Sequence, residues 1–472
     1  MKIILIRPPR IEGYCERRFI QQPINLAYIA AYLKKNGWKV ELWDYEVEEF
    51  EPASFQKRLE LACPRVVGIT GMTPTINNAH QVASQIKKYN PNIKIIIGGP
   101  HSSALPEKTL SEFINFDVVV IGEGEATCNE ICQRVSSKTS LEGIKGIAYR
   151  NNGKIKIEEK RAYLEDVDSL PYPDRGLFNR QLYSGAPSVG LNFDYQNKTE
   201  IFTSRGCAFR CIFCAIGNTI GFKTRLRSTE NILGEIKQCI QQYGYKHIGF
   251  EDTNFTSDPL RLYQLCQSLK ELKVTWNCQT RVDLVNKDVV KMMAESGCKK
   301  IAYGVESGSP RILGLIQKKI TLAQIKDAFR WTKESGIITC GFFMLGSHPS
   351  ETKMDVRMTE RLINQIRPDV FQLTIAVPYP GSALYEIMKE KNYLESEDWA
   401  KFNFLHSLPT WHTEHFSARE LIKIQRNIYI RHILIPKVIL QIIFNMFNRS
   451  NRKYYLNISK EIVKYLFIEK RK

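Results

Sequence analysis

Apolar runs rich in β-branched residues alternate with amphipathic segments over residues 1–140. The runs are "KIILIRPP", "KVELWDY", "RVVGITGM", "IKIIIGGP" and "FDVVVIGEG", and helix-like segments such as "INLAYIAAYLKKNG" and residues 76–89 lie between them. Continuous apolar strands that alternate with amphipathic helices indicate a parallel sheet covered by helices on both faces. We therefore expect a doubly wound α/β domain over residues 1–140, with ligands bound where strand C-termini meet loops.

A second series of strand candidates occupies residues 200–390. They are "EIFTSRG", "HIGFED", "VTWNCQTR", "KKIAYGVES", "ITCGFFML" and "VFQLTIAVP", with helical segments such as residues 229–243 and 286–297 between them. Six βα units predict a partial (β/α)6 barrel of the TIM type, in which chemistry gathers at the C-terminal ends of the strands.

Two other regions complete the expected architecture. Residues 141–199 contain a hairpin pattern, "GIAYRNNGKIKI", and the Pro-rich "DSLPYPDR", which together indicate a linker. Residues 391–472 predict a helical, basic C-terminal region. Within it, "IYIRHILIPKVILQIIFNMF" is interrupted too often by charged and polar residues to make a good transmembrane span.

The charge of the chain is concentrated at its C-terminus. Residues 416–472 contain thirteen Lys plus Arg against three Glu, so a net ten of the eighteen excess positive charges lie there. This tail is consistent with a helical cap that has a solvated basic face, and with a peripheral segment at an anionic membrane. No motif that reads RNA or DNA accompanies the charge, and we expect no nucleic-acid partner.

The first residues, "MKIILIRPPRIEG", contain an apolar run too short for a secretory signal. We therefore expect a cytoplasmic location in a reducing compartment, with peripheral membrane association through the tail as the alternative. Outside residues 207–214 the cysteines are scattered through apparent helices and strands, and most of them are expected to be buried thiols.

Three cysteines fall within eight residues of the segment "IFTSRGCAFRCIFCAIG", at Cys207, Cys211 and Cys214. Thiolates are soft ligands suited to zinc and to iron–sulfur clusters, but a structural zinc site normally has four protein ligands. The C-x3-C-x2-C spacing supplies three, with no fourth Cys or His nearby. A [4Fe–4S] cluster on three thiolates would keep one iron open to bind a small molecule.

This segment resembles the signature of the radical S-adenosylmethionine enzymes, which follows the first barrel strand in that family. The resemblance implies that Cys207, Cys211 and Cys214 hold the cluster and that its open iron binds S-adenosylmethionine, which one electron cleaves to a 5′-deoxyadenosyl radical. Phe213 occupies the aromatic position that flanks the adenine. The resemblance also implies a flavodoxin or ferredoxin as electron donor, whose acidic surface suits a basic partner.

Polar residues at other strand ends are further candidates for binding S-adenosylmethionine. Glu251 and Asp252 in "GFEDTNF" occupy the position where the family contacts the methionine amino group, although an acidic pair at a strand end is also typical of a helix cap. Arg281 in "QTRVDL" is suited either to a carboxylate of the cofactor or to a structural ion pair. Glu306 and Ser307 in "GVESGS" resemble a cofactor-contacting motif of the family.

The N-terminal domain resembles the cobalamin-binding class of these enzymes, and the resemblance covers about residues 1 to 390. It rests on the loops "PPR", "GITGMTPT", "GGPHSS" and "GEGE", although Gly-rich loops are also typical of tight turns alone. No D-x-H-x-x-G motif marks a histidine ligand for cobalt, and His101 lies outside that pattern. The residues expected to line the cobalamin pocket are Thr70, Thr73, Gly98, Gly99, Gly122 and Glu123.

The resemblance implies methylation of an unactivated carbon, with methylcobalamin as donor, on a small-molecule or lipid-like substrate. Three alternatives stay open: a cyclase or rearrangement enzyme similar to the anaerobic protoporphyrin cyclase, a methylthiotransferase, and a non-catalytic redox sensor that binds cobalamin and a cluster. Methylthiotransferases carry a second cluster on three N-terminal cysteines and a small C-terminal β-domain. The spacing of Cys15, Cys63, Cys128 and Cys132 and the helical tail do not match that pattern.

Overall fold

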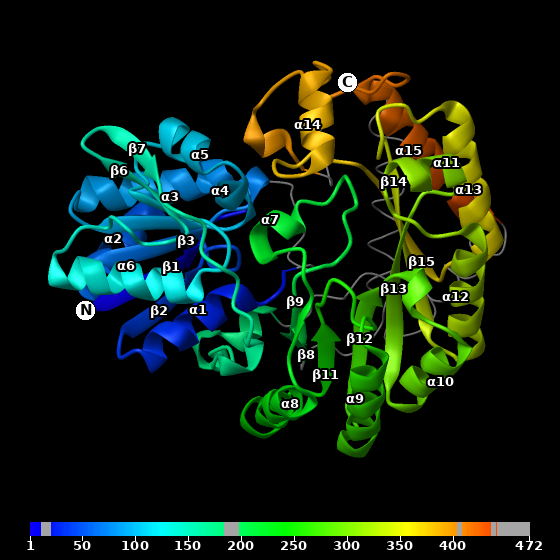
Figure 1. Ribbon diagram of the computed structural model, residues 1–472, viewed down its shortest axis with the longest axis horizontal. Coiled ribbons are helices and arrows are strands. Elements are labelled where there is room, and N and C mark those ends of the chain that lie inside the picture. Colours follow the sequence, from blue (N-terminus) through cyan, green and yellow to red (C-terminus); the bar gives the residue numbers. More distant parts are fainter. Residues whose placement is uncertain (11–19, 184–197, 404–407, 436–439, 441–472) are drawn as a thin grey trace.

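The computed structural model describes residues 1–10, 20–183, 198–403, 408–435 and 440, and contains two separate α/β units (Figure 1). The predictions that concern Cys15 and residues 441–472 of the basic tail lie outside the described residues. The α/β fold class, with a doubly wound sheet followed by a six-stranded partial barrel and a C-terminal helix, is confirmed.

The first sheet has the strand order β2-β1-β3-β4-β5-β6-β7. Its first five strands are parallel, whereas the hairpin of β6 and β7 is antiparallel and pairs with β5. The hairpin falls in the region predicted as a linker, so the first sheet continues past residue 140. The strands are β1 (Lys2–Arg7), β2 (Lys39–Asp44), β3 (Val66–Thr70), β4 (Lys94–Gly98), β5 (Val118–Val120), β6 (Ile147–Asn151) and β7 (Lys154–Ile157).

Helices cover both faces of this sheet, because its strands are apolar on both sides. Side chains of α2, α3 and α5 pack with one set of strand residues, and those of α1 and α6 pack with the alternate set. The predicted helix over residues 76–89 is α3. The helices are α1 (Ile24–Lys35), α2 (Pro52–Ala62), α3 (Ile76–Tyr89), α4 (Pro100–Ala104), α5 (Pro106–Glu112) and α6 (Glu125–Ser137).

The second sheet is parallel throughout, in the order β15-β14-β13-β12-β11-β8. Among the described residues β8 and β15 are its edges, so the barrel is open. The strands are β8 (Lys198–Ile201), β11 (His247–Phe250), β12 (Thr275–Thr280), β13 (Cys298–Glu306), β14 (Ile338–Leu345) and β15 (Val370–Ile375); a short ribbon pairs β9 (Ser204–Arg205) with β10 (Arg225–Leu226).

Eight of the nine α-helices that the structure describes after β8 begin at polar residues that cap them, and α7 is the exception. At Ser228, Asp258, Asn286, Ser309, Thr321, Thr352, Ser382 and Ser417 the side chain accepts a hydrogen bond from a backbone N–H of the first turn, the pattern expected at a helix start. The helices are α7 (Ile216–Ile220), α8 (Thr229–Tyr243), α9 (Pro259–Leu272), α10 (Lys287–Glu295), α11 (Pro310–Leu315), α12 (Leu322–Glu334), α13 (Lys353–Ile366), α14 (Ala383–Glu390) and α15 (Ala418–Ile433).

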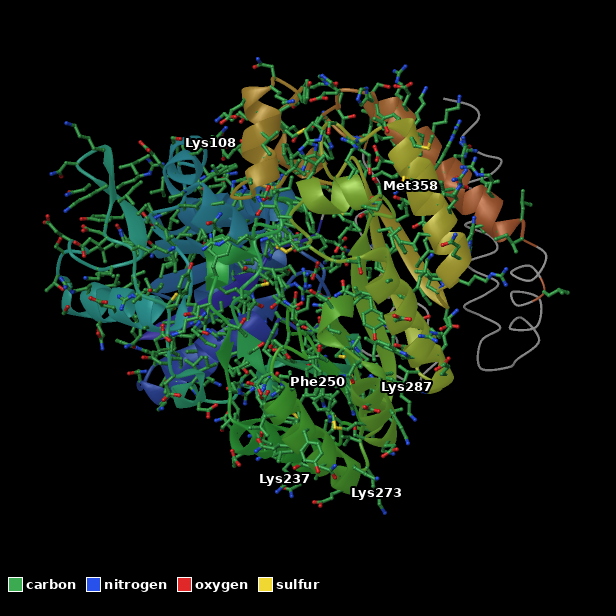
Figure 2. The ribbon with its side chains drawn as sticks, turned by 45° about the vertical axis from the view of Figure 1, so that its right-hand side comes forward. Lys108, Lys237, Phe250, Lys273, Lys287 and Met358 are labelled. Carbon is green, nitrogen blue, oxygen red and sulfur yellow. The ribbon has the colours of Figure 1, made fainter. Side chains whose placement is uncertain are left out.

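Aromatic side chains fill the space between the barrel strands and their helices. Phe250, labelled in Figure 2, stacks on Phe255 with the ring centroids 4.4 Å apart, and Trp276 packs against both. Lys237, Lys273 and Lys287, labelled in the same view, lie on the exposed surface of the barrel.

Helix α15 covers the open edge at β15. Tyr429 stacks on Phe371, and its hydroxyl accepts a 2.8 Å hydrogen bond from the backbone N–H of Leu373, whose carbonyl accepts a 2.7 Å bond from the Gln425 amide. Side chains of α15 thus satisfy backbone groups that an edge strand leaves unpaired. This part of the tail is a packed helix, and no helix in the described ranges is long and apolar enough to cross a membrane.

A buried ion-pair network joins the two units. Glu123 accepts hydrogen bonds from Arg205 and Arg225, and Glu125 accepts one from Arg205. Glutamates at the end of the first sheet therefore bind arginines that flank the cysteine loop of the second unit. Charge-assisted bonds of this kind are strong and directional when they are shielded from water.

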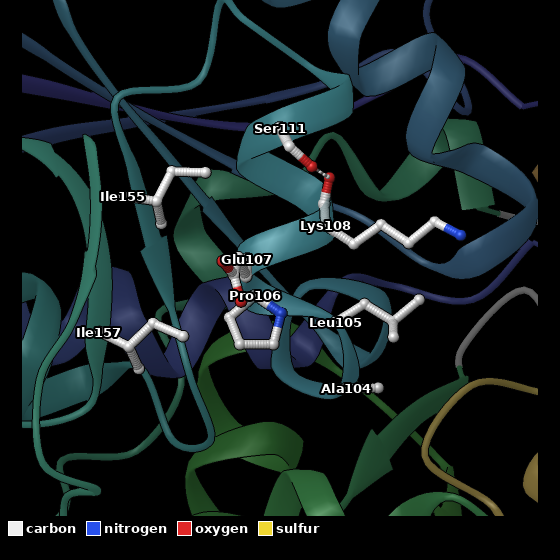
Figure 3. A pocket seen from close by; sticks show the side chains of 8 residues that line it. All are labelled: Ala104, Leu105, Pro106, Glu107, Lys108, Ser111, Ile155 and Ile157. Carbon is white, nitrogen blue, oxygen red and sulfur yellow. Dashed lines mark hydrogen bonds between the residues drawn. The ribbon is translucent and has the colours of Figure 1, made fainter. Parts of the chain in front are cut away.

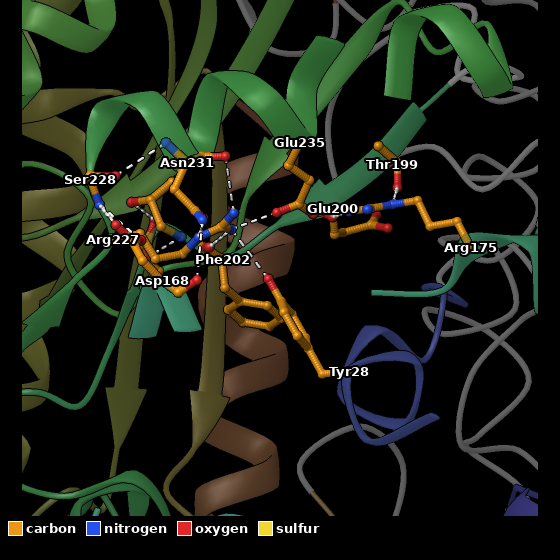
Figure 4. Close-up of polar contacts among 12 residues, drawn as sticks. Tyr28, Asp168, Arg175, Thr199, Glu200, Phe202, Arg227, Ser228, Asn231 and Glu235 are labelled. Carbon is orange, nitrogen blue, oxygen red and sulfur yellow. Dashed lines mark hydrogen bonds and ion pairs between the residues drawn. The ribbon is translucent and has the colours of Figure 1, made fainter. Parts of the chain in front are cut away.

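A second part of the network lies beside it (Figure 4). The Arg227 guanidinium donates to Glu235 at 2.5 Å and to the Tyr28 hydroxyl at 3.2 Å, and Arg175 donates to Glu235 at 2.6 Å and to Thr199 at 3.0 Å. Glu235 is fully buried and neutralises two buried arginines, one from the barrel and one from the segment that precedes it.

We expect Glu235→Ala to lower the free energy of unfolding by about 3–5 kcal/mol, because the substitution leaves two buried guanidinium groups without their carboxylate. Chemical denaturation of the purified protein measures the change. Glu230→Ala, at an exposed position of the same helix, is the control and should change stability by no more than about 0.5 kcal/mol. Equal losses of unfolding free energy in the two variants would show that the buried ion pairs of Glu235 do not stabilise the fold more than an exposed residue does.

Candidate functional site

Loops at the C-terminal ends of both sheets meet between the two units. Helix α7, which follows the cysteine loop, contacts α4, which follows β4, and lies between the sheets in Figure 1. The approach is close at Gly381, where an added Cβ would lie 3.0 Å from the Cβ of Ala104 and 2.8 Å from the side-chain nitrogen of Asn218 on α7. The cysteine loop and the Gly-rich loops therefore face one space.

The cysteine loop is fixed by backbone hydrogen bonds to distant segments. The N–H of Ile212 donates to the carbonyl of Ile316 at 3.2 Å, and the carbonyl of Ile212 accepts from the N–H of Leu384 at 2.8 Å. Along the loop, Cys207 is buried, Cys211 is half-buried and Cys214 is exposed as a whole residue.

The three thiols lie within one another's electrostatic field. Burial of its sulfur is the main cause that raises the pKa of the Cys214 thiol to about 11, and Cys211, Cys207 and Glu306 raise it further. Burial also raises the pKa of Cys211, while Lys318 and Arg281 act in the opposite direction. Cations beside the loop thus favour the thiolate forms that bind metal.

The three cysteines supply soft thiolate ligands of the kind that hold an iron–sulfur cluster. In the described part of the chain, no three side chains of His, Cys, Asp or Glu converge on one ion position. Thiolates that hold a cubane cluster each bind a different iron, so their sulfur atoms need not converge. Three soft ligands on one loop satisfy that requirement and leave one iron without a cysteine ligand.

Arg281 lies at the C-terminal end of β12 beside this loop. Its guanidinium forms two 2.9 Å bonds to Asp283, donates to the carbonyl of Lys318 at 2.6 Å and lies 3.7 Å from the ring centroid of Phe209. The structural ion pair that the sequence left open is therefore present. One nitrogen, Nη1, is buried without a partner among the described residues and remains a donor for a ligand.

Glu306 and Ser307, at the end of β13, point in different directions. Glu306 has a φ of 69° where the pairing of β13 with β14 shifts register, and its carboxylate accepts a 2.9 Å bond from Lys318. Positive φ at a residue other than glycine is strained and often marks a functional position. Ser307 is fully buried and bonds instead to Thr359 of α13, so the structure places only Glu306 beside the cysteines.

Glu251 and Asp252 also separate. Asp252 is buried and accepts bonds from the N–H and hydroxyl of Thr203 and from the hydroxyl of Ser204, so its carboxylate holds the loop after β8. Glu251 lies on the inward side of β11, where burial raises its pKa, and accepts a 3.3 Å bond from Gln21. Phe213 is partly buried against the core.

The inward face of the barrel keeps contact with solvent near the C-terminal ends of the strands. Near the C-terminal ends of β14 and β15 alternate residues are half-buried, whereas their neighbours in sequence pack into the core beneath the helices. The register pairs Phe342 with Gln372 and Met344 with Thr374 on this inward face. Polar and apolar side chains are thus both available to a ligand within the barrel.

Five of the six residues predicted to line the cobalamin pocket lie together. Thr70 and Gly98 pair across β3 and β4, Gly99 follows at φ 112°, and Gly122 at the end of β5 donates its N–H to Ser103 at 3.1 Å. A Cβ on Gly99 would lie 2.6 Å from the carbonyl oxygen of Gly71, so only glycine permits this approach of the two loops. Thr73 completes the set through its contact with His101.

The sixth residue, Glu123, does not face that space with the others. Its carboxylate binds Arg205, Arg225 and the backbone N–H of Leu164, so the structure assigns it to the interface between the two units. A sequence cannot distinguish these roles, since an acidic residue at a strand end suits both.

Three buried residues near the site were not singled out by the sequence. Asn254 donates to the sulfur of Cys207, Lys318 pairs with Glu306, and Trp399 packs edge-on against His101 with the ring centroids 5.0 Å apart. Only Asn254 had a sequence signal, because it lies in the strand-end motif "GFEDTNF". Lys318 and Trp399 reach the site through the tertiary fold.

His101 is buried beneath the Gly-rich loops. Its Nδ1 lies 3.4 Å from the hydroxyl of Thr73, and its Nε2 has no partner among the described residues. Burial lowers the pKa of His101 to about 4, so the ring is neutral.

A pocket of about 530 Å³ lies elsewhere, between α5 and the β6–β7 hairpin (Figure 3). It is lined by the edge of the first unit, including Lys108, Ile155 and Ile157, and contains none of the cysteines or Gly-rich strand ends. The converging loops are therefore the stronger candidate site.

Family models match both units of the chain. The B12 binding domain matches residues 16–132, and the Radical SAM superfamily matches residues 201–363. The two models follow the order of the two sheets.

Known proteins resemble the chain over most of its length. An uncharacterised methyltransferase of Pyrococcus horikoshii is 34% identical over 94% of this chain and 95% of its own length. The anaerobic magnesium-protoporphyrin IX monomethyl ester cyclase of Rubrivivax gelatinosus is 26% identical over 100% of this chain and 84% of its own length. The solved structure of the cobalamin-dependent S-adenosylmethionine radical enzyme OxsB with aqua-cobalamin bound superimposes with a TM-score of 0.76 at 17% identity. The superposition covers 99% of this chain and 72% of the OxsB chain, so the two share the fold.

We predict that the wild-type chain, reconstituted anaerobically with iron and sulfide, holds about four irons, and that Cys211→Ala loses most of them because one of three thiolate ligands is removed. Iron and acid-labile sulfide analysis measures this. Cys63→Ser, at an exposed cysteine on the first unit, is the matched control and should retain the wild-type content. Full iron content in Cys211→Ala would contradict the assignment.

Gly98→Leu tests the Gly-rich loops. A Cβ at Gly98 meets nothing nearer than 3.9 Å, so the position accepts the first carbon of a side chain, and we expect the rest of the leucine to occupy the space between the loops. We expect at least a tenfold weaker binding of hydroxocobalamin by absorbance titration, with iron content and melting temperature unchanged. Wild-type cobalamin affinity in this variant would place the cobalamin site elsewhere.

Proposed function

Because this chain belongs to the family of radical S-adenosylmethionine enzymes that carry a B12-binding domain, we propose that it transfers a methyl group to an unactivated carbon of its substrate. The family uses a [4Fe–4S] cluster, S-adenosylmethionine and cobalamin, acts on small molecules and needs an electron donor. The relative that is 34% identical over nearly its whole length is named a methyltransferase, which supports methyl transfer.

The contact between the loops assigned to the two cofactors is the strongest support for this function. Helix α7 continues the cysteine loop and packs on α4, which continues the Gly-rich loop after β4. A substrate placed between these loops would lie within reach of both cofactors, which is the arrangement that a methyl transfer between them requires.

Each group of residues has a separate role in this proposal. Cys207, Cys211 and Cys214 hold the cluster, and Thr70, Thr73, Gly98, Gly99 and Gly122 line the space for cobalamin. When bound, the cluster with S-adenosylmethionine supplies a carbon-centred radical and cobalamin supplies the methyl group. Arg281 offers its unpaired Nη1 to a carboxylate of S-adenosylmethionine.

The remaining predicted residues take different parts. Glu306, paired with Lys318 beside the cysteines, and Glu251, on the inward side of β11, are candidates to contact S-adenosylmethionine or substrate. Phe213 keeps its proposed place beside the adenine. Phe342 and Met344 on the inward face of the barrel would exclude water from the reacting groups. Asp252 and Ser307 support the loops from behind.

A cyclase or rearrangement reaction is the second candidate. The similarity to the magnesium-protoporphyrin cyclase extends over the entire chain, so the same cofactor sites suit both reactions. The two reactions differ in their use of S-adenosylmethionine, because repeated methyl transfer consumes a second molecule and produces S-adenosylhomocysteine.

Among the described N-terminal cysteines, Cys63 lies apart from Cys128 and Cys132. Cys63 ends α2 on one face of the first sheet, whereas Cys128 and Cys132 lie on α6 against the opposite face. The sheet separates Cys63 from Cys128 and Cys132, so these three described thiols cannot share one cluster, and Cys15 lies outside the described residues. The described C-terminal part ends in the helix α15.

We also propose an electron donor, a class of substrate and a cellular location for this chain. A flavodoxin or ferredoxin supplies the electron, and the substrate is a small molecule, with a lipid-like one included. A cytoplasmic location and peripheral membrane contact through the basic residues 416–472 remain predictions, and the described helix α15 supplies only part of that tail.

The function is tested by anaerobic reconstitution with iron, sulfide and hydroxocobalamin, followed by dithionite and S-adenosylmethionine. We expect 5′-deoxyadenosine from the wild type and none above background from Cys211→Ala. S-adenosylhomocysteine formed in the presence of a substrate supports a methyltransferase, and its absence during substrate turnover favours the cyclase. A reduced, fully loaded chain that leaves S-adenosylmethionine intact would contradict an enzyme and support a redox sensor.

A further inference from the structure

The loop after β11 is bonded to the segment that leads into the cysteine loop by three consecutive side chains. Asp252 binds Thr203 and Ser204, the hydroxyl of Thr253 donates to the carbonyl of Gly206 at 3.0 Å, and the amide of Asn254 donates to the sulfur of Cys207 at 3.4 Å. Only the last of these bonds reaches a proposed cluster ligand.

The Asn254 side chain is held in place where water has little access. Asn254 is 7% exposed and Cys207 is 8% exposed. The next residue is fixed, because the N–H of Phe255 donates to the carbonyl of Gln279 at 3.1 Å and the Phe255 ring stacks on Phe250. The amide therefore cannot turn to solvent without loss of packing.

In the contact between Asn254 and Cys207, the amide is the hydrogen-bond donor. A thiolate sulfur accepts hydrogen bonds and does not donate them, so the amide presents its N–H to the sulfur. A hydrogen bond to a sulfur ligand stabilises negative charge on the cluster, and the reduced cluster carries one more negative charge than the oxidised one. Such a bond therefore favours reduction.

We propose that Asn254 is a positioning residue that fixes the sulfur of Cys207 and raises the reduction potential of the cluster bound there. The inference rests on the proposed function, since it requires the cluster on Cys207, Cys211 and Cys214. It adds a role for a residue that contacts neither S-adenosylmethionine nor substrate in that proposal.

The test compares three variants of the full chain after anaerobic reconstitution. Asn254→Leu removes the donor at similar size, and Asn254→Asp keeps the shape but replaces the N–H2 group by a carboxylate oxygen. Thr253→Val is the matched control, because it removes the neighbouring bond to Gly206 and leaves the bond to sulfur. Iron and sulfide content and the midpoint potential from an EPR-monitored titration are measured for each.

In Asn254→Leu and Asn254→Asp we expect iron content close to wild type and a midpoint potential that is more negative. At the wild-type midpoint potential, the ratio of reduced to oxidised cluster should be about tenfold lower in these variants. This ratio corresponds to a shift in midpoint potential of about 59 mV for one electron. Thr253→Val should keep the wild-type potential.

An unchanged potential in either Asn254 variant, or an equal shift in Thr253→Val, would overturn the inference and leave the proposed function intact. If only Asn254→Leu loses the cluster, the midpoint potential of Asn254→Asp decides between the two results. If both Asn254 variants lose iron while Thr253→Val keeps it, the positioning role of Asn254 is supported. A wild-type chain that binds no four-iron cluster would instead overturn the proposed function.

Discussion

Arg205 lies two residues before the first cysteine of the loop and forms ion pairs with Glu123 and Glu125, which follow the last parallel strand of the first sheet. Arg225 binds Glu123 from the other side. The cysteine loop is therefore attached to the first sheet at its base. Partial burial makes these pairs costly to break singly, so the network sets how the two units are placed.

The placement brings together groups that neither unit holds alone. The barrel contributes three thiols, Arg281 and Glu306, and the first sheet contributes the close approach of Gly99 to Gly71. Trp399, from the segment after the barrel, closes over His101 and donates a 2.7 Å hydrogen bond to Glu112 on α5. Contacts on two sides thus hold the Gly-rich loops opposite the cysteines, and chemistry that uses both cofactors follows from that geometry.

The order of βα units and the spacing of the cysteines made the fold and a cluster on three thiolates predictable, because hydrophobic periodicity and soft-ligand chemistry are local properties. S-adenosylmethionine and cobalamin were predicted from the resemblance to a family. The roles of single polar residues were not predictable. Glu123, Asp252 and Ser307 have the strand-end positions of ligand-binding residues, yet they bond to Arg225, Thr203 and Thr359. Which role applies depends on a partner distant in sequence, and the same holds for Lys318 beside Glu306.

The proposed function requires that one chain holds a cluster and a cobalamin next to each other. EPR spectra of the fully loaded chain test it directly, since cob(II)alamin and the reduced cluster are both paramagnetic. We predict that reduction of the cluster broadens or splits the cob(II)alamin signal, and that this change is absent in Cys211→Ala. Two independent, unbroadened signals from a chain that contains both cofactors would contradict it.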